Sequence, residues 1–305
     1  LQLDERNEII RILQNLTAFV GDYADQIEQS VEALAKIDFA MMCAKYADDL
    51  RAAEPLLVDP YKKTGNPVIK LYQARHPLLP VETAVPIDVV PDEETFAVVI
   101  TGPNTGGKTV SLKTIGLLIL MAQSGLHIPV RSGSEFSVFK NVFADIGDEQ
   151  SIEQSLSTFS GHITNIIRIL KEADSKTLVL LDELGSGTDP QEGSALARAI
   201  LQYLIKKHIP CFVATHFSEL KTFAHVTPGA INASMEFDLK TLRPTYRLSI
   251  GLPGRSNALL IAEKLGLPAE ILEDARETID PEVQDTGALL DEIHRQQEAA
   301  RKARS

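Results

Sequence analysis

The sequence contains no tryptophan and only two cysteines, Cys43 and Cys211, among 305 residues. Two cysteines cannot supply a disulfide framework, so the composition fits a reducing compartment such as the cytoplasm. No basic segment followed by an apolar stretch occurs near Leu1, which argues against a secretory signal. The longest apolar run, Ile115–Ala122, is far shorter than the ~20 residues of a membrane-spanning helix. We therefore expect a cytoplasmic protein without membrane contact, and helix-like sequence from Leu1 onward predicts a segment of a longer protein.

Basic residues are also scarce, because 30 lysines and arginines stand against 42 aspartates and glutamates, a formal net charge of −12. Strong binding to duplex DNA depends on Lys and Arg side chains that neutralise phosphates. The sequence has no long basic run. The balance argues against strong, non-specific nucleic-acid binding by this chain alone, although a local basic face is compatible with it.

What the sequence does contain is a glycine-rich segment, T-G-P-N-T-G-G-K-T, that ends at Thr109. The apolar run Phe96–Ile100 predicts a buried strand before it, and apolar periodicity predicts a helix from after Lys108 to about Ser124. Strand, G-x-x-x-x-G-K-T and helix, in this order, form the phosphate-binding P-loop pattern. The glycines let backbone N–H groups approach phosphate oxygens. Lys108 is expected to reach the β- and γ-phosphates, and the Thr109 hydroxyl to coordinate Mg²⁺.

A second apolar run, Thr177–Leu181, ends directly in Asp182 and Glu183. A strand that closes on an aspartate is typical of P-loop NTPases, where the carboxylate supports the Mg²⁺ shell. The adjacent glutamate is positioned to polarise or deprotonate an attacking water. Two acids at a solvated strand edge are the alternative, which the P-loop earlier in the chain disfavours.

Two histidines are candidate ligands of the same nucleotide. A third apolar run, Cys211–Thr215, ends at His216, where open α/β sheets bind ligands, so His216 is expected to donate a hydrogen bond to the γ-phosphate. His76 lies between the predicted strands Val68–Tyr72 and Val85–Val90 and could approach the nucleotide base. A structural role is the alternative for each histidine. Together with the loop and the paired acids, this is chemistry for hydrolysing a nucleoside triphosphate.

A dense polar stretch, residues 145–160, follows the predicted strand Phe136–Phe143. Such a stretch in an α/β domain is where binding loops lie. Ser157 and Thr158 equally suit the cap of a predicted helix, Gly161–Ala173. Both interpretations remain open on the sequence.

The predicted site lacks an evident arginine for the γ-phosphate, apart from Arg255 as a candidate. In some NTPases a second subunit supplies such a group. We hypothesise that the segment Ser157-Thr158-Phe159-Ser160 completes the site of a neighbouring copy in a head-to-tail arrangement. This predicts a two-fold dimer with composite sites.

The patterning divides the chain into three segments. Residues 1–53 are predicted as a helical lever segment or a helix pair packed on a neighbouring domain. Residues 54–280 are predicted as a P-loop ATPase domain of the α/β class, with a mainly parallel central sheet flanked by helices. Residues 281–305 are predicted as a charged helical or disordered linker. Further predicted elements are an antiparallel pair and three helices: Ala233–Asp238, Thr245–Ile250, Glu192–Lys207 (capped by Thr188 or Asp189), Asn257–Leu265 and Ala269–Ile279.

These motifs resemble the MutS family of ATPases. The matching stretches are T-G-P-N-T-G-G-K-T, S-T-F-S, L-V-L-L-D-E-L-G-S-G-T-D-P and A-T-H-F-S-E-L. The chain is most similar to the bacterial MutS-II type, the second paralogue that bears a Smr domain. That likeness is carried by F-A-D-I-G-D-E-Q-S-I-E-Q-S-L-S-T-F-S and Y-R-L-S-I-G-L-P-G-R-S-N-A. The similarity covers roughly residues 1–280.

The resemblance implies an ABC-type ATPase-like fold and a homodimer with ATP and Mg²⁺ at the subunit interface. Its ATP-binding residues are expected to be His76, Gly102, Pro103, Asn104, Thr105, Gly106, Gly107, Lys108, Thr109 and Val110. Thr109 and Asp182 serve the metal, and Glu183 and His216 are catalytic. Ser157, Thr158 and Ser160 act in trans as a signature segment.

The resemblance also implies a clamp that acts on DNA, in branched structures and recombination suppression, or on stalled or collided ribosomes, or on both. Those contacts, including any to rRNA, lie largely outside this segment, and nuclease activity would belong to the absent Smr domain. Mismatch-repair members carry Met at the position of Thr105 and an acidic residue near His162, so mismatch recognition is not expected. An ATP-gated dimerisation module with incidental hydrolysis is the alternative. A small-molecule kinase and a transporter ATPase are disfavoured, because no Arg-rich lid and no L-S-G-G-Q occur.

Overall fold

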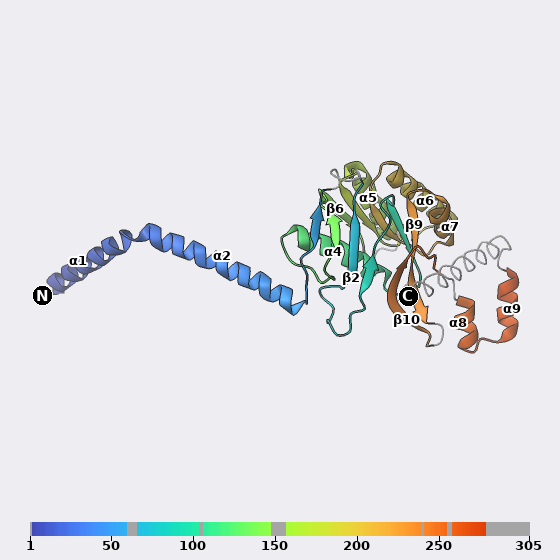
Figure 1. Ribbon diagram of the computed structural model, residues 1–305, viewed down its shortest axis with the longest axis horizontal. Coiled ribbons are helices and arrows are strands. Elements are labelled where there is room, and N and C mark those ends of the chain that lie inside the picture. Colours follow the sequence, from blue (N-terminus) through green and yellow to red (C-terminus); the bar gives the residue numbers. More distant parts are fainter. Residues whose placement is uncertain are drawn as a thin grey trace. The chain divides into compact units, whose positions relative to one another are not determined.

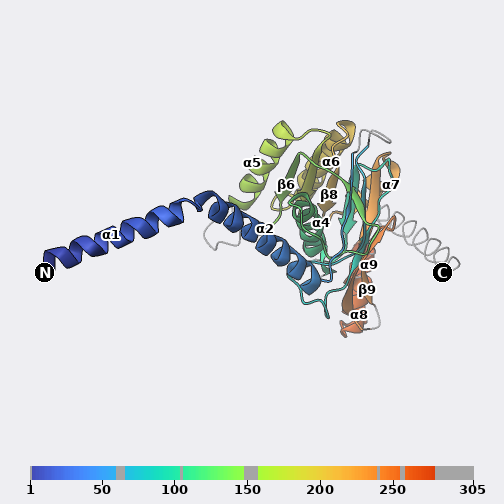
Figure 2. The same ribbon diagram turned by 60° about the vertical axis from the view of Figure 1, so that its left-hand side comes forward.

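The computed structural model describes residues 2–59, 66–103, 106–147, 157–238, 241–254 and 258–278. The chain divides into two compact units, of which the first ends at Arg51. This unit consists of α1 (Gln2–Gly21) and α2 (Ala24–Asp49), joined by a short turn (Figure 2). Gly21 is the last residue of α1. No residue of either helix is buried.

The second unit is built on a six-stranded sheet, within the described residues, in the order β10-β9-β4-β8-β7-β6. Neighbouring strands are parallel from β9 to β6, and only the edge strand β10 runs antiparallel to its neighbour. The strands are β4 (Ala97–Thr101), β6 (Asn141–Asp145), β7 (Thr177–Leu181), β8 (Cys211–Ala214), β9 (Ala230–Asp238) and β10 (Arg243–Ile250). The predicted mainly parallel α/β sheet is confirmed, as is the antiparallel pair at its edge.

A second sheet has the strand order β1-β5-β2-β3, formed by β1 (Leu56–Val58), β5 (Glu135–Ser137), β2 (Ile69–Ala74) and β3 (Ile87–Val89). The prediction of one strand over Phe136–Phe143 is therefore wrong. Residues 135–137 pair with β2 in this second sheet, whereas residues 141–145 pair with β7 in the central sheet. Apolar residues occur in both strands and between them, so the sequence does not reveal that the chain changes sheets near Lys140.

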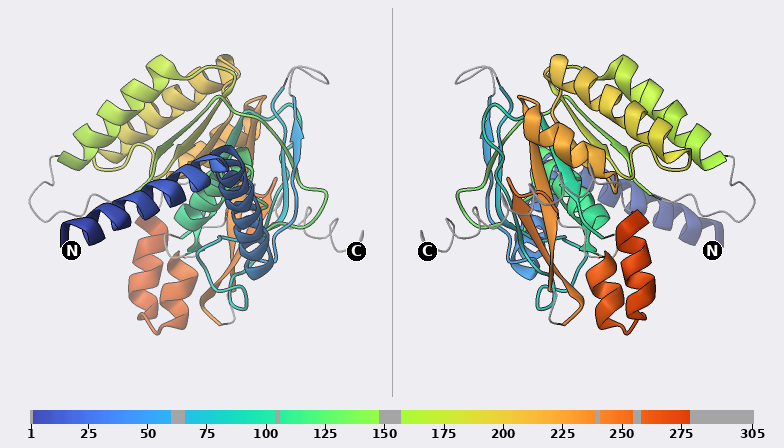
Figure 3. Two further views of the ribbon diagram at one scale, coloured as in Figure 1. Left: turned by 90° about the vertical axis from the view of Figure 1, so that its left-hand side faces the viewer. Right: turned by 90° about the vertical axis from the view of Figure 1, so that its right-hand side faces the viewer.

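Helices cover both faces of the central sheet (Figure 3). Buried side chains of α5, α6 and α7 pack against alternate strand residues such as Val99 and Val179. Because successive strand residues point to opposite faces, Leu180 lies on the other face, where it contacts α4 at Gly116. The helices are α4 (Lys108–Gln123), α5 (Ser157–Glu172), α6 (Pro190–Lys206) and α7 (Ser218–Val226).

Two further helices, α8 (Ala258–Lys264) and α9 (Ala269–Thr278), form a pair (Figure 1). Of the two predicted caps of α6, Thr188 and Asp189, the structure has Asp189, whose carboxylate accepts hydrogen bonds from the backbone N–H groups of Gln191 and Glu192. The helix begins at Pro190, two residues before the predicted start. Helix α5 begins at Ser157, four residues before the predicted start, so Ser157 and Thr158 lie in its first turn. No helix of the described ranges is both long and apolar enough to cross a bilayer.

Candidate active site

The predicted motifs that follow β4, β7 and β8 lie where these parallel strands of the central sheet end. Strand β8 lies between β4 and β7, and the register pairs Ile100 with Ala214 and Val213 with Leu181. The carboxyl ends of these strands therefore lie at one level. The glycine-rich loop, the two acids and His216 directly follow them in the sequence, so all three predicted motifs share one edge of the sheet.

The loop after β4 turns sharply into a helix. Every residue of β4 is buried, and Gly107, the N-cap of α4, adopts φ +99°, a left-handed conformation that favours glycine. The next residue, Lys108, is 2% exposed, and its Nζ donates a hydrogen bond to the carbonyl oxygen of Gly102 at 2.6 Å. Burial lowers the pKa of Lys108, an effect that the carboxylates of Glu183 and Asp182 oppose. A cation is thus held inside the loop, next to two acids.

Thr109 and Asp182 join the loop to β7. The Thr109 hydroxyl donates to Oδ2 of Asp182 at 2.5 Å, and Oδ1 of the same carboxylate accepts from the backbone N–H of Glu183 at 3.1 Å. Asp182 is only 7% exposed. A hydroxyl and a carboxylate oxygen this close together can bind one hard cation, and oxygen is the ligand that Mg²⁺ prefers. The donor set therefore fits the predicted metal.

A cavity of about 340 Å³ opens in front of this pair. Glu183, one of its wall residues, has φ +49°, a strained conformation that for non-glycine residues is concentrated at functional sites. The hydroxyl oxygen of Ser186 in the same wall is buried and has no hydrogen-bond partner within the described chain. Such an atom is normally satisfied by a ligand or water. The cavity is lined by Thr109, Lys113, Gly147, Phe159, His162, Asp182, Glu183, Ser186 and Gly187.

A second cavity, of about 310 Å³, lies on the other side of the start of α4. His76 lines it together with Gly107 and Val110, so three predicted ATP-binding residues meet here. Nδ1 of His76 accepts a hydrogen bond from the backbone N–H of Leu78 at 3.2 Å. Burial, and then the charge of Lys113, lower the pKa of His76. The remaining walls are largely apolar: Ala74, Leu79, Thr83, Ala84, Val85, Ile87, Ser111, Thr114, Met235 and Tyr246.

Sequence reasoning missed Met235 and Tyr246, which belong to the β9–β10 pair. Tyr246 lies where the register of this pair shifts, between Pro244 and Leu248, and it adopts φ +60°. A bulge of this kind re-aims a side chain. No local pattern in the sequence announces it.

His216 follows β8 as predicted, but it is exposed and lines neither cavity. Its ring packs on Phe217, with ring centroids 4.4 Å apart. The γ-phosphate role of His216 thus stays a prediction.

Several predicted residues lie outside what the structure describes. Asn104, Thr105, Arg255 and residues 148–156 are in this group. For Ser157 and Thr158 only the helical backbone is described, while Ser160 is exposed on α5. The predicted action of this segment in trans is therefore untested.

Sequence reasoning also missed a polar cluster beside the first cavity. Nδ1 of His162 and Oδ2 of Asp145 are 2.7 Å apart, and Nδ2 of Asn165 donates to Oδ1 of Asp145 at 2.9 Å. Asp145 closes β6, whereas the two partners lie one turn apart on α5. Their sequence separation of 17 and 20 residues leaves no short motif to find.

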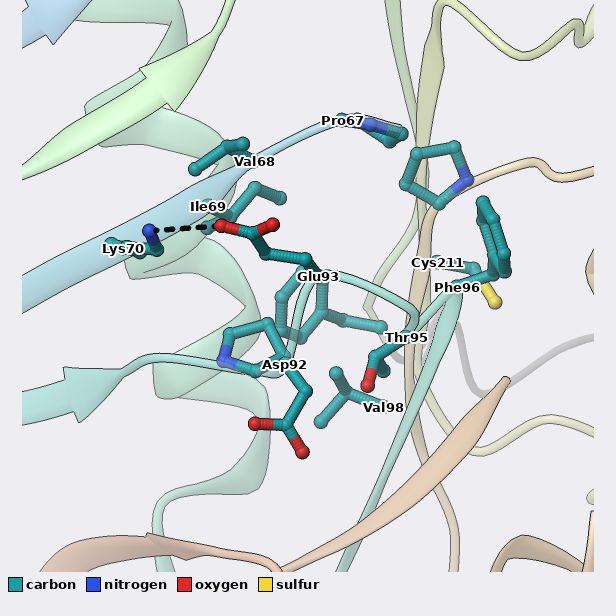
Figure 4. Close-up of a pocket in the computed structure, with 13 residues that line it drawn as sticks. Pro67, Val68, Ile69, Lys70, Asp92, Glu93, Thr95, Phe96, Val98 and Cys211 are labelled. Carbon is teal, nitrogen blue, oxygen red and sulfur yellow. Dashed lines mark ion pairs between the residues drawn. The ribbon is translucent and has the colours of Figure 1, made fainter. Parts of the chain in front are cut away.

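A third hollow lies at the opposite, amino end of β4 and β8 (Figure 4). It measures only about 20 Å³, too small for a nucleotide. Lys70 lies 3.6 Å from Glu93 and 2.9 Å from Glu135 here, and the hydrogen bond to Glu135 is the main cause that raises the pKa of Lys70. The pair with Glu135 links β2 to β5 within the second sheet, and the pair with Glu93 joins that sheet to the segment before β4, so we assign both to structure.

Comparison with known proteins agrees with the fold described above. A family model described as MutS domain V matches residues 98–281. The protein named Endonuclease MutS2 from Thermomicrobium roseum is 54% identical over 98% of this chain, which covers 38% of that relative. The protein of the same name from Halalkalibacterium halodurans is 52% identical over 96% of this chain, which covers 37% of that relative. The one from Brevibacillus brevis is 51% identical over 98% of this chain, which covers 38% of that relative. The chain thus spans well under half the length of these curated relatives.

Proposed function

Because this chain belongs to the MutS family and carries its ATPase domain, we propose that it binds and hydrolyses ATP at the edge formed by β4, β8 and β7. One observation carries the proposal: the 2.5 Å hydrogen bond between Thr109 and Asp182, which links the phosphate loop to the acids of β7. In the proposed complex, loop N–H groups and the buried Lys108 bind the phosphates. Gly106 and Gly107 contribute backbone to this cradle, and Pro103, which has no N–H, accepts the hydrogen bond from the N–H of Gly106 that closes the turn of the loop.

We assign Mg²⁺ to Thr109 and Asp182, whose oxygens suit it. When bound, Mg²⁺ neutralises phosphate charge and orients the phosphates for attack by water. The described residues contain no group of three or more His, Cys, Asp or Glu side chains that could hold a metal on their own.

The chain's own residues have separate tasks in this proposal. Glu183 accepts a proton from the attacking water in the 340 Å³ cavity. The apolar 310 Å³ cavity receives the base, with His76 and Val110 in its wall. His216, at the end of the intervening strand, contacts the γ-phosphate after a side-chain rearrangement. Ser157, Thr158 and Ser160 complete the site of a second copy in a homodimer.

Glu183→Gln tests hydrolysis directly, because glutamine keeps the size of the side chain but cannot accept a proton. We expect the rate of ATP hydrolysis to fall by roughly 100-fold or more, while ATP is still bound. Glu172→Gln, at the exposed end of α5, is the matched control and should leave the rate unchanged. Hydrolysis at the wild-type rate in Glu183→Gln, or failure of the wild-type chain to retain any adenine nucleotide, would refute the proposal.

We further propose that the complete, cytoplasmic protein uses this ATPase to drive a clamp on nucleic acid. The support is the name of the relatives, Endonuclease MutS2. The substrate would be branched DNA, RNA within stalled ribosomes, or both, and the contacts would lie mainly outside this acidic segment. Any nuclease activity would likewise belong to another part of the protein. Recovering the nucleic acid that co-purifies with full-length Glu183→Gln in ATP identifies the substrate, and recovery of none contradicts the clamp.

Glu183→Gln also separates this function from the alternative, an ATP-gated dimerisation module. If the full-length variant binds ATP, dimerises and keeps its biological output, hydrolysis is incidental. Loss of the output with ATP still bound supports a hydrolytic cycle.

A further inference from the structure

Asp145, at the end of β6, sets the orientation of one imidazole ring. Asp145 is buried, and its carboxylate binds His162 through Oδ2 and Asn165 through Oδ1. A carboxylate can only accept a hydrogen bond from a neutral imidazole, so Nδ1 of His162 carries the hydrogen in this contact. In this neutral form the other ring nitrogen, Nε2, is an acceptor. Asp145 thus fixes both the tautomer and the direction of the ring.

The ring fixed in this way belongs to the wall of the 340 Å³ cavity. His162 lines it together with Thr109, Asp182 and Glu183. The His162 side chain is 29% exposed, although its carboxylate partner is nearly buried. A histidine that only docked α5 onto β6 would not need an open edge on this cavity. Helix α5 is already anchored by the buried residues Ile166 and Ile169.

We infer that His162, oriented by Asp145, is a second acceptor for the water that attacks ATP. This inference rests on the proposed hydrolysis and adds a residue to it. The water oxygen forms a bond to the γ-phosphorus, and the bond from that phosphorus to the β–γ bridging oxygen breaks, with its electron pair remaining on ADP. One water proton goes to the carboxylate of Glu183. The second O–H donates a hydrogen bond to Nε2 of His162 and stays on the inorganic phosphate.

Two acceptors fix the orientation of a water better than one does. With Glu183 alone, the water can rotate about its single hydrogen bond, and its lone pair points at phosphorus for only part of the time. A second fixed acceptor removes that rotation, which is the kind of pre-organisation that accelerates phosphoryl transfer. His162 therefore acts on the reaction step rather than on ATP affinity.

The test compares His162→Ala with Asn165→Ala, which removes the other hydrogen bond to the same carboxylate. Wild-type hydrolysis is measured first, because its absence would refute the proposed function and not this inference. We expect kcat of His162→Ala to fall by at least ~10-fold with KM for ATP within ~3-fold. Asn165→Ala should keep kcat within ~2-fold of wild type, with melting temperatures of the two variants lowered alike.

Added imidazole provides a second readout, which a docking role would not affect. It should enter the space left in His162→Ala and restore part of kcat, but leave Asn165→Ala unchanged. The inference is overturned if His162→Ala keeps wild-type kcat. It is equally overturned if both variants lose activity to the same extent and imidazole restores neither.

Discussion

Replacing Lys108 by methionine should separate the stability of this protein from its affinity for ATP. Methionine matches the length of lysine but has no charge. Lys108 is 2% exposed, and burial lowers its pKa from the ordinary 10.5, so the folded chain bears a cost for holding this cation. The variant removes that cost and also loses the hydrogen bond to Gly102, which contributes about 1.5–3 kcal/mol for a charged donor. Because the two changes oppose each other, we expect the melting temperature without nucleotide to move by no more than roughly 2–4 °C, or ~1 kcal/mol.

The affinity for ATP should respond very differently. In the proposed complex the ammonium group contacts phosphate oxygens, and the loss of about 1.5–3 kcal/mol corresponds to a roughly 10- to 150-fold rise in Kd. Isothermal titration calorimetry with ATP and Mg²⁺ measures Kd, and differential scanning calorimetry without nucleotide measures stability. Lys206→Met, at the exposed end of α6, is the control that should alter neither. A Kd within threefold of wild type, or a loss of more than about 10 °C in melting temperature, would refute this reasoning.

Three further predictions concern single contacts. Thr109→Val removes the hydroxyl that donates to the buried Asp182, so the free energy of unfolding should fall by about 1–3 kcal/mol and Mg²⁺-dependent ATP binding should weaken. Thr109→Ser keeps a hydroxyl and should retain both. Equal behaviour of the two variants in calorimetry would contradict the contact. Lys113→Ala should raise the pKa of His76 toward 6.5, because burial and this lysine both lower it, and an NMR titration of the His76 ring measures the change. Since the folded-state pKa of His76 is depressed, its contribution to stability is complete above pH 6.5 and is lost as the pH falls through that lower pKa; an unchanged titration in Lys113→Ala would exclude the lysine as a cause. Gly193→Ala would place a Cβ atom 2.3 Å from the carbonyl oxygen of Gly185, so thermal melts should show a loss of about 1–3 kcal/mol that Gly21→Ala, with nothing within 4 Å, does not cause.

Local sequence patterns predicted those parts of the molecule whose structure is determined by residues close in the sequence. The run into Asp182, the glycine loop before Lys108 and the Asp189 cap of α6 are each determined by neighbouring residues, and each is found where it was expected. The parallel sheet followed from apolar runs that alternate with helical periodicity. With all strands but the last parallel, the motifs after them had to meet at one edge.

Tertiary contacts decided what the sequence did not reveal. The break between β5 and β6 depends on which sheet each strand joins, and apolar residues occur in both strands and between them. Tyr246 reaches its cavity through a bulge that exists only in the paired strands. The contact between Asp145 and His162 requires α5 to be packed on β6. His216 was expected near the phosphates from its place after β8, but the direction of its ring depends on Phe217.

The wall made by β9 and β10 has a consequence for engineering. On the proposed function, ATP phosphates meet backbone groups, whereas the base meets side chains such as Tyr246, Met235 and Val85. On this proposal, the residues that determine the preference for a base differ from those that act on the bond to the γ-phosphate. Enlarging the space beside Tyr246 would tune the chain to a bulky, synthetic purine triphosphate without touching Lys108 or Asp182. On the proposed function, hydrolysis of such an analogue would be confined to this protein in a living cell, and other ATPases would be unaffected.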